Sequence, residues 1–140
     1  MALMPVEAAI AELLADVVVL PVEQCSLAQA GGRVLRQAVI AGVDVPPLDN
    51  SAMDGYALRL TDAAQACIPL SQRIAAGQVG SPLRTGTAAR IFTGAPVPPG
   101  ADTVVMQEDC ESVDGGIRIR EMPVLGQHIR PKGQDIASGS

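Results

Sequence analysis

The sequence predicts a mainly β protein with a helical amino-terminal arm, an α+β arrangement whose larger part is a compact antiparallel β domain. Apolar residues recur at helical spacing only near the amino end of the 140-residue chain. From Val39 onward, glycine and proline are frequent and the apolar runs are short, which favours strands joined by turns. Asp114-Gly115-Gly116 separates two such runs, and this pattern indicates a β-hairpin.

The first expected element is a helix from about Pro5 to Val17. Proline suits the first position of a helix, and Glu7 in the first turn interacts favourably with the helix dipole. One face of this helix is apolar, and its residues are Val6, Ile10, Leu13, Leu14 and Val17.

Weaker signals follow in the arm. An extended connection is expected over Val18–Val22, because Pro21 cannot continue a helix. Ser26 is a candidate N-cap for a brief helix that ends near Ala30. Arg33–Val39 resumes an apolar spacing and predicts a further helical stretch.

The β domain is predicted from short apolar runs between turn residues. The strand candidates are Tyr56–Leu58, Arg73–Ala76, Arg90–Phe92, Thr103–Met106, Glu111–Val113 and Ile117–Arg120. Pro46-Pro47 disfavours helix and places the domain boundary nearby. We therefore expect an arm over residues 1–44, a β domain over 45–130 and a segment over 131–140 that returns to the arm.

Composition and charge exclude several classes of function. The net charge is −5 and the basic residues are scattered, so no nucleic-acid partner is expected. No apolar run is long enough for a membrane span, and the amino end lacks the basic residues of a secretory signal, so we expect a cytoplasmic protein. His128 is the only histidine, which argues against a Ser–His–Asp or Cys–His mechanism.

The sulfur-containing and aromatic residues limit the core and the redox chemistry. The three cysteines are far apart and odd in number, so neither a disulfide framework nor a zinc site is expected, and each thiol is expected to be buried and structural. With one Tyr, one Phe and no Trp, the core must consist of aliphatic side chains.

Three segments concentrate polar side chains at turns. The first, Pro46–Leu58, places two carboxylates, an amide and a hydroxyl before a strand, although by itself it is equally consistent with a polar turn that has no further role. In the second, Thr93 and Gly94 offer a hydroxyl and an open backbone amide to an oxyanion. In the third, Ile129–Ile136, arginine and lysine lie beside an aspartate and could hold phosphate.

Together the three segments resemble the amino-terminal region of the MoeA family, the molybdopterin molybdotransferases of molybdenum-cofactor synthesis, which are related to the carboxy-terminal domain of gephyrin. The string Asp-Asn-Ser-Ala-Met-Asp-Gly-Tyr-Ala at Asp49–Ala57 is the signature of that family. The pattern Thr-Gly-Ala-x-x-Pro-x-Gly-Ala-Asp-x-Val-Val follows at Thr93–Val105, and Ile129–Ile136 also fits. The resemblance covers essentially the whole chain.

The resemblance implies a reaction and a set of site residues. Proteins of that family insert molybdate into adenylated molybdopterin and release AMP, with magnesium assisting. Their cleft lies between the β domain of one subunit and the α/β domain of the other in a homodimer, and a MogA-like protein or domain adenylates the molybdopterin. By motif, the resemblance assigns catalytic roles to Asp54, Thr93, Arg130 and Asp135, and substrate-loop roles to Asn50, Ser51 and Gly94.

Within these assignments some alternatives stay open. Thr93 and Arg130 could supply hydrogen-bond donors to the oxyanion, while Asp54 and Asp135 could orient those donors or steer magnesium. No metal ligand is assigned in this chain, because the magnesium ligands are expected mainly outside it. The four catalytic candidates are expected to converge on one exposed face of the β domain.

Two classes of function are compatible with the sequence. In the first, the chain is the amino-terminal part of a molybdotransferase, lacks the catalytic α/β domain and is inactive alone. In the second, it is a non-catalytic binding or assembly module of the same fold. A Gly-Gly-x-Ser motif downstream of Ser140 would favour the first.

Overall fold

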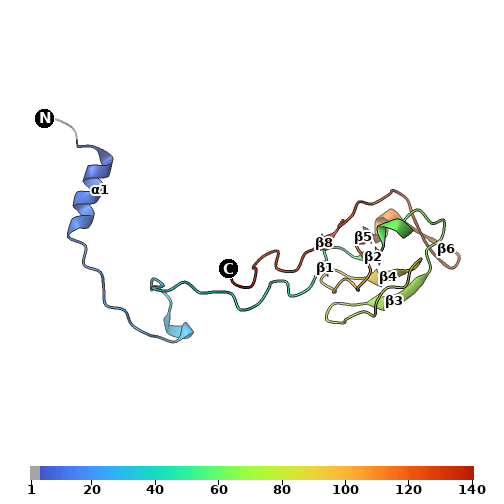
Figure 1. The fold of residues 1–140 in the computed structure, drawn as a ribbon, viewed down its shortest axis with the longest axis horizontal. Helices are drawn as coiled ribbons and strands as arrows, with labels where there is room; N and C mark the ends of the chain where they lie inside the picture. Colours follow the sequence, from blue (N-terminus) through green and yellow to red (C-terminus); the bar gives the residue numbers. More distant parts are fainter. Residues whose placement is uncertain (1–3) are drawn as a thin grey trace. The chain divides into compact units, whose positions relative to one another are not determined.

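A computed structural model describes residues 4–140, which form a mainly β fold with few helices, as the sequence predicts (Figure 1). The chain divides into two units between Val39 and Ile40. With η marking 3-10 helices, the elements are α1 (Val6–Ala15), η1 (Leu27–Gln29), β1 (Asn50–Ser51), β2 (Gly55–Leu58), η2 (Leu60–Asp62), β3 (Leu70–Ile74), β4 (Ala88–Ile91), β5 (Thr103–Met106), η3 (Gln107–Asp109), β6 (Cys110–Val113), β7 (Gly116–Ile119) and β8 (Ile129–Arg130).

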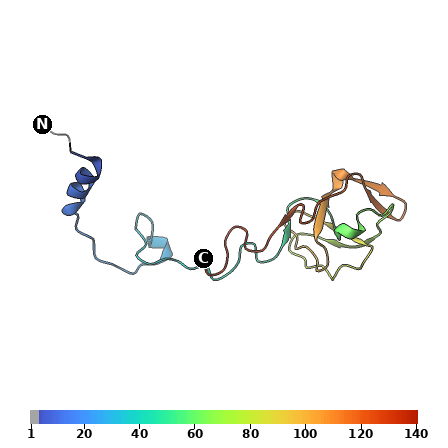
Figure 2. The same ribbon diagram turned by 45° about the horizontal axis from the view of Figure 1, so that its top comes forward.

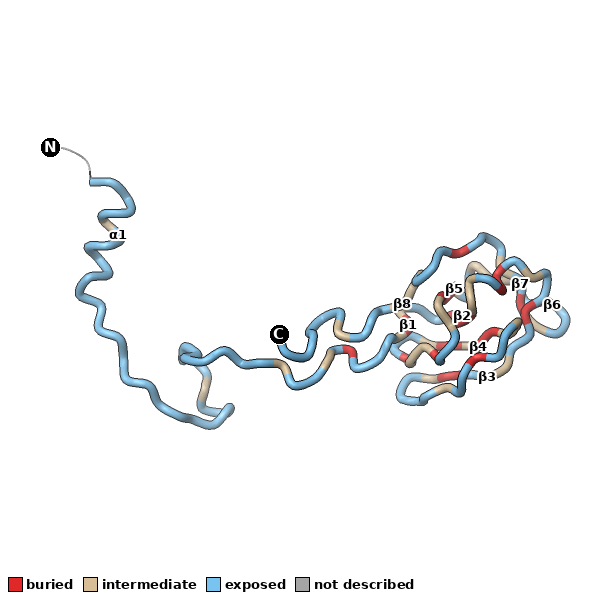
Figure 3. Tube along the Cα trace, viewed as in Figure 1, coloured by how far each residue is buried: buried red, intermediate tan, exposed pale blue. Residues whose placement is uncertain are grey.

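Among its described residues, from Met4 onward, the first unit contains one α-helix, and the expectation of a helical arm is only partly correct. Helix α1 lies within the predicted range, but no residue of it is buried. The predicted helix over Arg33–Val39 is wrong, since this stretch is irregular. Val34 is 95% exposed, and a helix this short is not stable in water without an apolar surface to pack on. Figure 3 shows this exposure along the unit.

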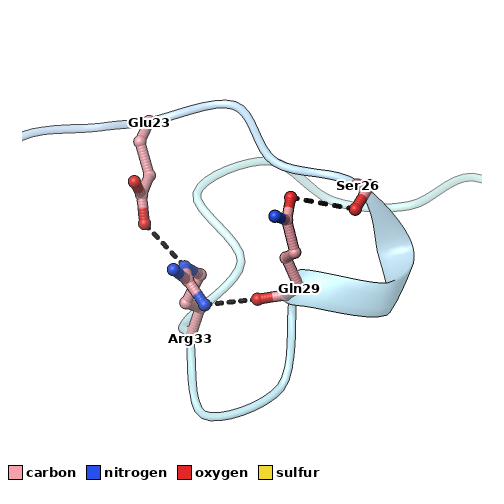
Figure 4. A network of polar contacts seen from close by, with 4 residues as sticks. All are labelled: Glu23, Ser26, Gln29 and Arg33. Atoms are coloured by element: carbon pink, nitrogen blue, oxygen red, sulfur yellow. Dashed lines mark hydrogen bonds and ion pairs between the residues drawn. The ribbon is translucent and has the colours of Figure 1, made fainter.

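A small polar network holds the turn around η1 (Figure 4). The Arg33 Nε donates to the Glu23 carboxylate at 2.6 Å, and its Nη1 donates to the Gln29 carbonyl. Ser26 occupies the expected N-cap position, but its hydroxyl donates to the Gln29 side-chain oxygen at 3.0 Å and caps no backbone amide. Polar side chains therefore give this segment its shape, since apolar burial contributes little to it.

The centre of the second unit is a four-stranded sheet with the order β3-β4-β2-β5. Strand β2 is antiparallel to β4 and β5, and Gly55 lies opposite Ile91 on one side and Met106 on the other. The β3–β4 pair is parallel, an exception to the antiparallel expectation. A segment of 13 residues connects Ile74 to Ala88, and it is long enough to carry the chain back for parallel pairing.

Both faces of this sheet are buried under aliphatic side chains, as the near absence of aromatic residues requires. Because side chains alternate along a strand, neighbours such as Ala57 and Leu58 belong to different clusters. One cluster consists of Ala57, Ile74, Leu83, Ala89, Ile91, Ala95 and Val104. The other consists of Leu58, Ala63, Ile68, Ala88, Val105 and Ile117.

Strands β6 and β7 form the predicted hairpin, with Val113 opposite Gly116 and a two-residue turn at Asp114-Gly115. Gly115 has a φ of +84°, a conformation that other residues adopt only with strain. The expectation of buried thiols is wrong for Cys25 and Cys67, which are exposed. Cys67 directly precedes the fully buried Ile68, so the alternation of the extended backbone turns its thiol outward.

The segment that precedes β1 and the segment that follows β8 lie side by side (Figures 1 and 2). The Val45 amide donates to the Ile136 carbonyl at 2.8 Å, and the Ala41 amide donates to the Ser140 carbonyl at 3.0 Å. The expected division at residues 44 and 130 stays a prediction. Among residues 4–140, no helix has the length and apolar character needed to cross a membrane.

Candidate functional site

Two of the predicted site residues, Asp54 and Thr93, are in direct contact. Asp54 lies immediately before β2, and Thr93 lies two residues after β4. Because β2 and β4 are antiparallel neighbours with Gly55 opposite Ile91, the start of one and the end of the other share one end of the sheet. The Asp54 Oδ1 accepts hydrogen bonds from the Thr93 amide and the Thr93 hydroxyl, both at 2.8 Å.

The loops on either side fix this contact through their backbones. Ser51 is buried, and its hydroxyl donates to the Met53 carbonyl at 2.6 Å. Its backbone carbonyl accepts from the Gly94 amide, and its own amide donates to the Ala95 carbonyl, both at 2.9 Å. Gly94 has a φ of +80°, which makes glycine the favoured residue at this turn. Ser51 and Gly94 thus join the turn that carries Asp54 to the turn that carries Thr93.

Gly55 makes the close approach of β2 and β5 possible. A Cβ atom at this position would lie 1.9 Å from the Val105 carbonyl oxygen, so no other residue fits without a backbone shift. The close packing of β2 against β5 therefore requires the glycine that follows Asp54 in the signature motif.

The Asp54 carboxylate is held in its ionised form. The Thr93 amide and hydroxyl bonds, followed by the positive charge of Arg90, lower the pKa of Asp54 below its usual value. Glu108 lies near enough for its charge to interact with that of Asp54, and the pKa of Glu108 is lowered mainly by the hydrogen bond from the Gln107 side chain. The Asp54 and Glu108 carboxylates thus both interact with the charge of the Arg90 guanidinium.

The contact with Asp54 limits the ability of Thr93 to bind an anion. Both of its donors, the amide and the hydroxyl, are directed at Asp54. An oxyanion can take these donors only when the carboxylate moves aside, because two anions cannot share them without strong repulsion. The Asp54 carboxylate therefore occupies the place that an oxyanion would take at this turn.

The other predicted pair, Arg130 and Asp135, forms a second contact. The Arg130 Nη2 donates to Asp135 Oδ1 at 2.9 Å and to Oδ2 at 2.7 Å, and both side chains are about half exposed. Nearby, the Asp49 Oδ1 accepts from the Lys132 amide at 2.7 Å, and the Lys132 ammonium lies 3.2 Å from Asp44. Arg130 lies opposite Asn50 in the β1–β8 pair, so Asn50 links this contact to the signature loop.

The four catalytic candidates form two pairs, Asp54 with Thr93 and Arg130 with Asp135. Among residues 4–140, no hydrogen bond or ion pair joins one pair to the other. Their convergence on one face and their individual roles stay predictions. Sequence reasoning missed Arg90, whose guanidinium stacks on the Tyr56 and Phe92 rings and whose positive charge acts on Asp54. A charged residue between the apolar Ala89 and Ile91, two positions before the only Phe of the chain, was the available signal.

Comparison with known proteins identifies relatives of the chain. It is 40% identical over 143 residues to the molybdopterin molybdenumtransferase of Synechococcus elongatus, covering 95% of this chain and 36% of that protein. It is 43% identical over 124 residues to molybdopterin molybdenumtransferase 2 of Mycobacterium tuberculosis, covering 81% and 30% of the two chains. The chain thus spans about a third of the length of these relatives.

Solved structures agree with the sequence relatives. A crystal structure of the molybdopterin biosynthesis moeA protein from Pyrococcus horikoshii superposes with a TM-score of 0.75 at 34% identity, covering 84% of this chain and 33% of that one. A family model described as the MoeA N-terminal region, domains I and II, matches residues 4–140. The chain therefore belongs to the MoeA N-terminal region family.

Proposed function

We propose that this chain is the amino-terminal part of a molybdopterin molybdenumtransferase, an enzyme of molybdenum-cofactor biosynthesis that inserts molybdate into adenylated molybdopterin and releases AMP. The observation that supports this most strongly is the contact between Asp54 and Thr93, because it joins two motifs 39 residues apart into one arrangement at an exposed sheet end. The names of the relatives, molybdopterin molybdenumtransferases, support a role in molybdenum-cofactor biosynthesis.

The chain contributes part of a shared site. Arg130 and Thr93 supply donors for an oxyanion, Thr93 once the Asp54 carboxylate has moved aside, and until then the contacts with Asp54 and Asp135 hold these donors in place. The rest of the site comes from sequence outside this chain and from a second subunit of a homodimer. A MogA-like protein or domain supplies the adenylated molybdopterin.

We propose that the apolar face of α1, formed by Ile10, Leu13 and Leu14, contacts the second subunit. Ile10, Leu13 and Leu14 on this face are 51%, 77% and 60% exposed. Apolar side chains repeated along one helix at this exposure are typical of an interaction surface.

Magnesium does not fit the described residues by themselves. Residues 4–140 contain no group of three or more His, Cys, Asp or Glu side chains placed to hold a metal ion. Asp54 is engaged by Thr93, and Asp135 is engaged by Arg130.

A chimera tests the proposed function. The matching region of the Synechococcus elongatus relative is replaced by this chain, and AMP release from adenylated molybdopterin is measured with and without molybdate. We expect molybdate-dependent turnover by the chimera and none by the 140-residue chain alone. A chimera that folds and assembles like the parent enzyme but releases no AMP would favour a non-catalytic binding or assembly module.

A further inference from the structure

Arg90 makes an unusual set of contacts at the end of the sheet that carries Asp54 and Thr93. Its Nη1 donates to the Gly55 carbonyl at 2.8 Å and to the Ile91 carbonyl at 3.1 Å. Gly55 directly follows Asp54, and Ile91 precedes Thr93 by two residues. One nitrogen atom therefore bridges the two strand ends from which the Asp54–Thr93 contact is built.

The other terminal nitrogen of the guanidinium contacts Gln107, the first residue of η3, which directly follows β5. The Arg90 Nη2 donates to the Gln107 side-chain oxygen at 2.6 Å, and the Gln107 amide donates to the Asp54 carbonyl at 3.1 Å. The start of η3, which follows β5, is thereby fixed against the residue that carries the carboxylate. Arg90 thus connects the ends of β4, β2 and β5 at one point.

Two aromatic rings hold the guanidinium in this orientation. Its carbon lies 4.4 Å from the centre of the Phe92 ring and 5.3 Å from the centre of the Tyr56 ring. These are the only Phe and the only Tyr of the chain. Stacking of a planar guanidinium on aromatic faces restricts its rotation, and an ammonium group could not reproduce the forked set of donors.

From this geometry we propose that Arg90 is a positioning residue, which holds the Asp54 carboxylate and the Thr93 turn in register through the backbone carbonyls of Gly55 and Ile91. Its positive charge also faces Asp54 and Glu108, so it favours the ionised carboxylate that accepts the Thr93 bonds. The consequence for turnover rests on the proposed function, whereas the positioning itself does not.

Arg73 provides a matched control. Its guanidinium carbon lies 4.8 Å from the centre of the same Phe92 ring, and its side chain belongs to the neighbouring strand β3. Among residues 4–140 it makes no hydrogen bond to the strand-end carbonyls that Arg90 holds. Arg73→Gln therefore removes a stacked cation from Phe92 and leaves the bridge between the strand ends intact.

Nuclear magnetic resonance of the 140-residue chain tests the positioning. The two measurements are the hydrogen exchange of the Thr93 amide and the titration of the Asp54 carboxyl carbon. We expect Arg90→Gln and Arg90→Lys to speed exchange of the Thr93 amide by about tenfold or more, relative to other protected amides, and to raise the pKa of Asp54. Arg90→Lys, which retains the charge, should raise this pKa less than Arg90→Gln. Arg73→Gln should leave both measurements unchanged.

Two outcomes would contradict the positioning role of Arg90. Folded Arg90→Gln and Arg90→Lys variants with the parent exchange rate and the parent Asp54 pKa would overturn the proposal. If Arg90→Gln does not fold, Arg90→Lys decides, and unfolding of both variants would assign Arg90 to the stability of the sheet and contradict a specific positioning role.

Turnover of the chimera gives an independent comparison. We expect Arg90→Lys to lower kcat more than it changes KM, and Arg73→Gln to leave both near the parent values. Loss of kcat to the same extent in both variants would contradict the positioning role. If the unsubstituted chimera is inactive, the proposed function fails, and the resonance measurements still decide the role of Arg90.

Discussion

Asp54 is an ionised acceptor, and this has a consequence for stability. Because the two Thr93 bonds lower its pKa below the ordinary 3.8, the folded state favours the carboxylate. The resulting stability is present above pH 3.8 and is lost as the pH falls toward the lower pKa of the folded state. We expect Asp54→Asn to lower the free energy of unfolding by an amount that is constant between about pH 7 and 5 and shrinks below about pH 4. Urea unfolding of the 140-residue chain at a series of pH values measures this, and a difference that persists in acid would contradict it.

The three thiols differ in their surroundings and should differ in reactivity. Burial, followed by the charge of Asp109, raises the pKa of Cys110 to about 11. The reactive thiolate is therefore scarcer at Cys110 at pH 8, while Cys25 and Cys67 are exposed. We expect iodoacetamide to modify Cys25 and Cys67 at least about tenfold faster than Cys110, as followed by peptide mass spectrometry. In urea the three rates should become similar, and equal rates in the folded chain would contradict the burial of Cys110.

At the level of residues, the sequence indicated the chemical groups but not their contacts. The resemblance carried by the signature motif and the Thr-Gly-Ala turn singled out Asp54 and Thr93. Their mutual hydrogen bonds depend on the β2–β4 register, which places Gly55 opposite Ile91 and is not encoded in either motif. Arg90 was missed for the same reason, because its partners are backbone carbonyls of two strands.

Among the elements, β2 depends most directly on a single residue. A Cβ at Gly55 would meet the Val105 carbonyl oxygen, so the strands can accept alanine only by moving apart. We expect Gly55→Ala to lower the free energy of unfolding by about 3 kcal/mol or more. Gly42, which has nothing within 4 Å of the same position, provides the control. Denaturant unfolding of both variants checks this, and a Gly55→Ala variant as stable as Gly42→Ala would contradict the close packing.

Elements with strong local signals could be predicted, and elements that depend on distant partners could not. The α1 spacing and the Asp114-Gly115 turn act within a few residues, so both were located from the sequence. The Arg33–Val39 helix was wrong because its apolar residues find no surface to cover among the described residues. Strand β3 begins three residues before the expected Arg73, since its parallel pairing with β4 sets its limits.

At the scale of the whole molecule, the exposed face of α1 predicts self-association. We expect the 140-residue chain to form a two-fold dimer at high micromolar concentration, because burying Ile10, Leu13 and Leu14 against a second copy removes them from water. Sedimentation over a concentration series measures the mass. Replacing Leu13 and Leu14 by lysine should give a monomer with a folded β domain. A monomeric parent chain at the highest concentration would contradict the interface.

Turnover of the chimera with Asp54 replaced by alanine tests most directly whether the Asp54–Thr93 contact belongs to the reacting site. If it does, AMP release should fall by about 100-fold or more, while the free energy of unfolding falls only by the small amount that the loss of the two Thr93 bonds to an exposed side chain causes. The solvent-facing position of Asp54 is the reason to expect so small an effect on folding. Equal losses of activity and stability, or full activity in the variant, would contradict a catalytic role and leave the contact as part of the fold alone.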